Sequence, residues 1–98
     1  MNIELLKRLT ETNGVSGDEK NIRDILLPEF KKLTDDVIVD NLGNIIAHFP
    51  GKGPKVMIAA HMDEVGFIVS HIEDFGYLRI IPVGGIDSRF VYAQKVVV

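Results

Sequence analysis

The chain has 98 residues, of which 46% are hydrophobic and 26% are charged. This composition is ordinary for one small globular domain. With 11 basic and 14 acidic residues the net charge is −3, so nothing indicates electrostatic attraction to nucleic acid or to anionic membrane. The absence of cysteine excludes disulfides, thiolate metal sites and a cysteine nucleophile, and it is compatible with a reducing cytoplasm.

The first residues, 1–8, are amphipathic rather than a basic segment followed by an apolar core, so they do not predict a signal peptide. No apolar run approaches the roughly 18 residues that a transmembrane helix needs. We therefore expect a cytoplasmic location.

Two helices are predicted for the first third of the chain. Apolar residues at helical spacing, with charges between them, predict the first over residues 3–12. After a break, Ser16 followed by Glu19 fits a capping box, in which each side chain bonds the other's free backbone N–H. Pro28 interrupts the second helix and predicts a kink near residues 24–28, because proline removes a helical hydrogen bond. The apolar face of this helix comprises Ile22, Ile25, Leu26, Phe30 and Leu33.

The rest of the chain has the pattern of strands. The first two are expected to form a hairpin around the turn at residues 41–44, and the last two pair across a turn at 73–76. The strand between these hairpins is expected to be buried, because Val56–Ala60 is wholly apolar. Strands are predicted at 37–39, 45–49, 55–61, 65–72 and 78–83, and residues 94–98 look like the opening of another. A terminal apolar strand needs a partner, so we expect the polypeptide to be incomplete or to be completed by another chain.

The most informative residues are His61 and Asp63, which follow the apolar run directly. Positions i and i+2 of an extended strand point to the same face, so the imidazole and the carboxylate should lie side by side where the strand leaves the core. In α/β sheets, ligands bind beyond the carboxyl ends of strands. The pair could therefore be part of a metal site, either as two ligands or as one ligand and the carboxylate that orients it.

The spacing by itself favours a plainer interpretation. His61 could be a hydrogen-bonded core histidine and Asp63 a residue that caps the strand end, since a lone His-x-Asp occurs often by chance. Catalytic zinc generally needs three protein ligands and a water, and two-metal sites need more. Other polar or turn residues fit surface roles at least as well as ligand roles, namely His48, His71, Glu73–Asp74, Gly84–Gly85 and Arg89.

Four motifs in order change this balance. They are Gly14-Val15-Ser16-Gly17-Asp18-Glu19, Asp40-Asn41-Leu42-Gly43-Asn44, Ala60-His61-Met62-Asp63-Glu64-Val65-Gly66-Phe67 and Pro82-Val83-Gly84-Gly85. Together they closely resemble the start of the glutamyl-aminopeptidase family, which includes the self-compartmentalising TET aminopeptidases and some members formerly labelled cellulases or endoglucanases. The resemblance covers essentially the whole chain.

This resemblance implies an α/β catalytic domain with an inserted β-rich dimerisation domain. Residues 1–71 would belong to the first, and 72–98 would begin the second. The implied reaction is metal-assisted removal of N-terminal residues from peptides. His61 would be the first ligand of a two-metal centre, of zinc or cobalt, and Asp63 the catalytic-site carboxylate that steers it. The implied partners are peptide substrates and further copies of the chain in a dimer-based oligomer, or a completing chain.

The family's remaining ligands and its general base lie downstream of such a segment and are absent here. The chain alone is therefore expected to be inactive. Three interpretations stay open: the N-terminal piece of a metallo-aminopeptidase, a non-catalytic truncated paralogue that binds or assembles with full-length subunits, and half of a split enzyme.

Overall fold

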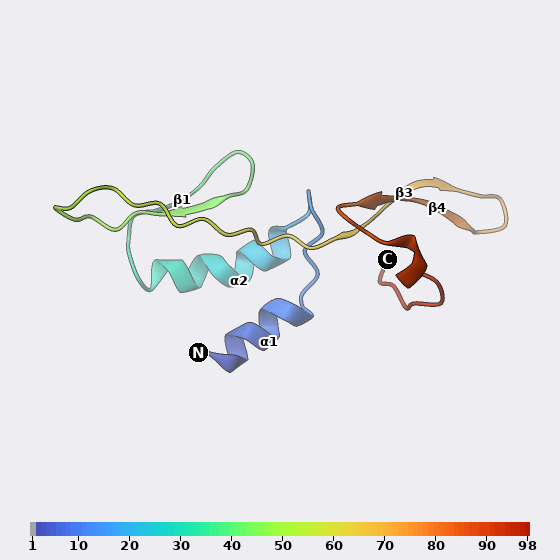
Figure 1. The fold of residues 1–98 in the computed structure, drawn as a ribbon, viewed down its shortest axis with the longest axis horizontal. Helices are drawn as coiled ribbons and strands as arrows, with labels where there is room; N and C mark the ends of the chain where they lie inside the picture. The colour runs from blue at the N-terminus through green and yellow to red at the C-terminus, as the bar shows by residue number, and fades with distance from the viewer. Residues whose placement is uncertain (1) are drawn as a thin grey trace.

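The computed structural model describes residues 2–98, which form two helices, two antiparallel hairpins and a short 3-10 helix (Figure 1). Both predicted helices and both predicted hairpins are present. The hairpins are separate two-stranded sheets, so these residues form a small α/β arrangement without a continuous sheet. The elements are α1 (Ile3–Glu11), α2 (Lys20–Lys31), β1 (Val37–Val39), β2 (Ile45–Ala47), β3 (Gly66–Ile72), β4 (Leu78–Val83) and η1 (Ser88–Phe90).

The two helices begin differently. The side chain of Asn2 caps α1 by accepting a hydrogen bond from the backbone N–H of Leu5 at 3.1 Å. At the start of α2, Glu19 is the N-cap residue but its side chain makes no capping bond. Its carboxylate instead accepts a hydrogen bond from the backbone N–H of Gly17. The hydroxyl of Ser16 donates to Asp63 and not to the helix. The predicted capping box is therefore wrong.

The first hairpin is fixed by its turn. The carboxylate of Asp40 accepts hydrogen bonds from the backbone N–H groups of Leu42 and Asn44, each at 2.9 Å, and from the Asn44 side chain at 2.8 Å. Gly43 has a φ of +88°, a conformation that favours glycine. Because β2 also packs against α2, this turn lies close to the start of the helix.

The second hairpin joins β3 and β4 in antiparallel register, from Gly66 opposite Val83 to Ile72 opposite Leu78. The register shifts between Val69 and His71, which leaves one extra residue on β3. The link from β3 back to the helices is the segment that contains His61 and Asp63, drawn in yellow in Figure 1.

Two predicted strands are not formed. Residues 55–61 are extended but unpaired, and Val56, Met57 and Ile58 are 82%, 89% and 94% exposed, so the expected buried strand is wrong. Residues 94–98 are likewise neither paired nor buried. An apolar run becomes a strand only where a neighbour supplies its hydrogen bonds, and no segment within residues 2–98 pairs with either one.

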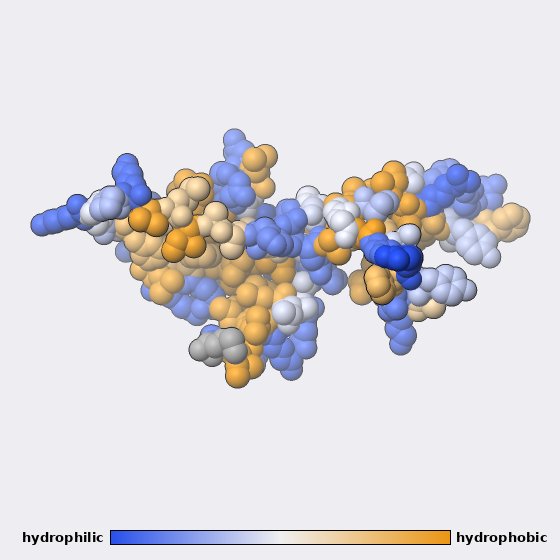
Figure 2. All heavy atoms as spheres, viewed as in Figure 1, coloured by the Kyte–Doolittle hydropathy of each residue, from blue (hydrophilic) through white to orange (hydrophobic). Residues whose placement is uncertain are grey.

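Apolar side chains therefore lie largely on the surface of this part of the chain, where they form the orange areas of Figure 2. Among residues 2–98, Ile22 is the only buried hydrophobic side chain, at 5% exposed. The radius of gyration is 17.6 Å, against about 13 Å for a compact domain of 100 residues. The helices described here are all too short or too polar to cross a membrane.

Candidate functional site

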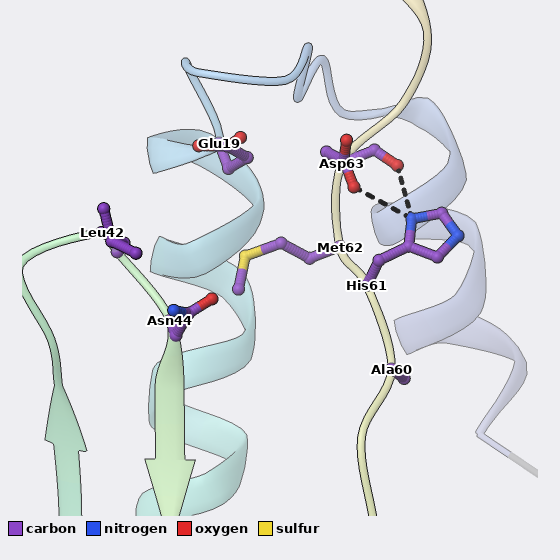
Figure 3. Close-up of a pocket in the computed structure, with 8 residues that line it drawn as sticks. Glu19, Leu42, Asn44, Ala60, His61, Met62 and Asp63 are labelled. Atoms are coloured by element: carbon purple, nitrogen blue, oxygen red, sulfur yellow. Dashed lines mark hydrogen bonds and ion pairs between the residues drawn. The ribbon is translucent and has the colours of Figure 1, made fainter. Parts of the chain in front are cut away.

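His61 and Asp63 lie side by side, as their spacing predicted (Figure 3). Nδ1 of the His61 ring is 3.0 Å from Oδ1 of Asp63 and 3.1 Å from the Asp63 carbonyl oxygen. Both partners are acceptors when the carboxylate is ionised, so the ring donates from a protonated Nδ1. This tautomer leaves Nε2 as the nitrogen with a free lone pair.

The residue between them points the other way. Met62 is directed toward Asn44 and the start of α2, on the opposite side of the chain from the His61 ring (Figure 3). It lines a shallow pocket of about 110 Å³ between Glu19, the turn at residues 42–44 and the His61–Asp63 pair. The alternation of side chains is that of extended backbone, although no regular strand is formed here.

Asp63 is held by a second partner that sequence reasoning missed. The hydroxyl of Ser16 donates a hydrogen bond to Oδ2 of Asp63, while Oδ1 faces His61. Ser16 precedes Asp63 by 47 residues, so no local spacing rule could have paired them. The spacing of Ser16 and Glu19 instead predicted that the Ser16 hydroxyl would cap the second helix.

These contacts set the charge of the pair. The Ser16 hydroxyl, and after it the His61 ring, lower the pKa of the Asp63 carboxyl, because each hydrogen bond stabilises the ionised form. The side chain of Asp63 is 37% exposed and that of His61 is 85% exposed. Asp63 is therefore an ionised acceptor that orients an otherwise solvent-facing imidazole.

A metal ion needs several donor side chains at one place. Within residues 2–98 no group of three or more histidine, aspartate, glutamate or cysteine side chains is close enough to hold a metal. Nε2 of His61 makes no hydrogen bond to any of these residues, so it fits a single imidazole ligand. The described residues can thus supply one ligand but do not by themselves form a complete metal site.

The other candidate residues occupy surface positions. His48 is 64% exposed and its Nδ1 lies 2.8 Å from Asp36. His71, on β3, is 62% exposed and 3.8 Å from Glu73. Arg89 binds Asp87 within the η1 turn. None of these side chains reaches the His61–Asp63 pair, which agrees with the plainer interpretation of each.

Comparison with known proteins matches two family models to different parts of the chain. The profile of the family described as M42 glutamyl aminopeptidase matches residues 43–98, and one described as AMPT matches residues 2–26. A lysyl aminopeptidase from Pyrococcus furiosus is 50% identical over 94 residues, which are 95% of this chain and 27% of the relative. The putative aminopeptidase FrvX from Escherichia coli is 48% identical over 98 residues, which are all of this chain and 28% of the relative.

Solved structures agree. An aminopeptidase from the archaeon Desulfurococcus kamchatkensis has a TM-score of 0.83 at 44% identity, over 89% of this chain and 25% of that one. A TET aminopeptidase from a marine sediment archaeon of the Thaumarchaeota gives 0.82 at 39%, also over 89% and 25%. A Thermotoga maritima protein titled endoglucanase gives 0.77 at 45%, over 86% and 28%. The chain thus spans about a quarter of the length of the proteins it matches.

Proposed function

The chain belongs to the M42 glutamyl aminopeptidase family, and we propose that it supplies the His61–Asp63 part of an active site that removes N-terminal residues from peptides. The support is twofold. The relatives and structural neighbours that share this segment are named aminopeptidases, and the segment carries an imidazole oriented by a carboxylate.

The contact between Nδ1 of His61 and Oδ1 of Asp63, at 3.0 Å, is the observation that carries the proposal. A carboxylate that accepts from one ring nitrogen fixes the tautomer, and it makes the other nitrogen a better metal ligand. His61 is proposed as a ligand through Nε2, and Asp63 as the catalytic-site carboxylate that orients it. Because Ser16 also binds Asp63, the carboxylate has a fixed position.

The proposed cofactor is a pair of divalent ions, zinc or cobalt. Polypeptide other than residues 2–98 would provide the remaining ligands and the general base, since the described residues supply one ligand. A divalent metal bound in such a site would polarise the scissile carbonyl and lower the pKa of the water bound to the metal. The contribution of this chain is to hold the ligating imidazole and to keep the proton on Nδ1, where it is donated to the Asp63 carboxylate.

The domain assignment is part of the same proposal. Residues 1–71 would belong to the catalytic domain, and residues 72–98 would begin a β-rich dimerisation domain. This boundary falls within β3, so the β3–β4 hairpin would connect the two units. A dimer-based oligomer, or a completing chain, would then be the partner, and peptides the substrates.

Substitution of His61 tests the proposal. His61→Ala should lose bound metal and hydrolysis of peptides with a free N-terminus. His48→Ala is the matched control, because His48 also pairs with an aspartate, at 2.8 Å, but lies away from the site. Asp63→Asn should retain much of the metal and lose most of the rate. Full activity and metal content in His61→Ala would contradict the proposal.

A further inference from the structure

The segment between the two helices, residues 13–17, is docked onto the chain that carries the site. The backbone N–H of Glu64 donates to the carbonyl of Gly14 at 2.8 Å, and that of Ser16 donates to the carbonyl of Glu64 at 3.3 Å. The Glu64 carboxylate also accepts from the N–H of Gly14 at 3.0 Å. The two backbone bonds form a parallel bridge between Val15 and Glu64. The segment is thus a structural support as well as a helix break.

Tight packing fixes the segment on both sides. A Cβ added to Gly14 would lie 2.4 Å from Cγ1 of Ile22 on α2, closer than side-chain atoms normally approach. A Cβ added to Gly66, at the start of β3, would lie 2.6 Å from Val15. Gly14 and Val15 are therefore packed closely between α2 and β3, on the N-terminal side of Ser16.

The Ser16 hydroxyl completes a chain of contacts that ends at the imidazole. Ser16 donates to one oxygen of the Asp63 carboxylate, and the other oxygen accepts from the His61 ring. Rotation of the carboxylate would break one of the two bonds. Apart from Asp63, no residue between 2 and 98 forms a hydrogen bond with the ring. The orientation of the His61 ring thus depends on Asp63, and the orientation of the Asp63 carboxylate depends on Ser16, in the segment between the two helices.

We propose that Ser16 is a positioning residue of this active site, which fixes the Asp63 carboxylate and through it the ring of His61. The inference rests on the proposed function for its catalytic consequence. Groups that hold a metal ligand from behind typically contribute 10- to 100-fold to metal affinity or activity. Ser16 acts one contact further away, so a loss of about tenfold in kcat is expected, with KM unchanged because Ser16 need not touch the peptide.

The test uses the full protein with Ser16→Ala, which removes the hydroxyl, and Ser16→Thr, which restores it. The first readout is the ¹H–¹⁵N NMR signal of the His61 ring in metal-free protein, which reports the tautomer without any activity. In the parent protein Nδ1 should carry the proton. In Ser16→Ala the population of the Nδ1-protonated tautomer should fall, because the backbone carbonyl of Asp63 then remains the one acceptor with a fixed position. Ser16→Thr should recover the parent signal.

The control is Ser70→Ala on β3, because the Ser70 hydroxyl also makes one hydrogen bond, to the carbonyl of Arg79 at 3.1 Å. It should leave both the His61 signal and kcat unchanged. Ser16→Gly is a second way to remove the hydroxyl, in a turn that tolerates glycine, and it keeps the test valid if Ser16→Ala does not fold.

Parent-like ring signals and kcat in the variants without the hydroxyl would overturn the inference, while His61→Ala would still lose its metal and leave the proposed function standing. If instead His61→Ala kept its metal, the proposed function would fall and the catalytic part of this inference with it. The two failures are therefore distinct.

Discussion

Gly14→Ala tests the packing that places the site. The new Cβ would lie 2.4 Å from Cγ1 of Ile22, and Ile22 is only 5% exposed, so neither group can move into solvent. Overpacking of this kind costs about 1–3 kcal/mol. Restricting the unfolded chain returns about 0.4–1 kcal/mol. We expect a net loss of between about 0 and about 2.6 kcal/mol in the free energy of unfolding.

Urea denaturation followed by circular dichroism measures this loss. Gly85→Ala is the control, because nothing lies within 4 Å of its added Cβ, and it should be neutral or slightly stabilising. Ile22→Ala alone should cost about 2–5 kcal/mol. In the double variant the new methyl group at position 14 occupies space that the Ile22 side chain vacates. The loss of stability in the double variant should therefore be smaller than the sum of the two single losses, by about 0.5–3 kcal/mol. Strict additivity of the two losses, or a Gly14→Ala variant more stable than the parent, would refute the packing argument.

Three further predictions concern local elements. Hydrogen bonds from the Asn44 side chain, and after it from the Asn44 backbone, lower the pKa of Asp40. The β1–β2 turn should therefore be most stable above about pH 4 and should loosen as the pH falls through the lowered pKa. Amide-exchange protection factors of the turn measure this, and a decrease in these factors on raising the pH would contradict it. Asn2→Ala removes the side chain that accepts a hydrogen bond from Leu5 and should destabilise α1 by about 0.5–2 kcal/mol, as measured by amide exchange in its first turn. Asn21→Ala, inside α2, is the control, because it removes an asparagine side chain without removing a helix cap. Gly66→Ala should force Val15 away and weaken the Ser16–Asp63 contact, which the His61 ring signals would reveal, and unchanged signals would argue against the docking of residues 13–17.

Local signals predicted the helices and hairpins well. The apolar periodicity of residues 3–12 and the turn chemistry of Asp40 and Gly43 act over a few residues, so they can be recognised from the sequence without knowledge of distant contacts. The proximity of His61 to Asp63 follows from the same logic, because it depends only on an extended backbone at two positions.

Longer-range features could not be predicted in this way. The apolar run at Val56–Ala60 has the composition of a buried strand, but a strand also needs a neighbour to pair with, and the described residues provide none. The motif around Ser16 has the spacing of a capping box, yet its hydroxyl reaches Asp63 through a loop that only tertiary packing places. In both cases the local sequence pattern is present, but the structure that forms depends on a residue or strand far away in the sequence.

Whether this chain works within a metal-dependent aminopeptidase can be decided by native mass spectrometry of the protein purified from its own source with metals retained. We expect a mass well above the 10.9 kDa of these 98 residues, with about two metal ions per site. Loss of those ions in His61→Ala, but not in His48→Ala, would tie them to the proposed ligand. A bare, metal-free species of 10.9 kDa would show that the chain does not work as part of such an enzyme.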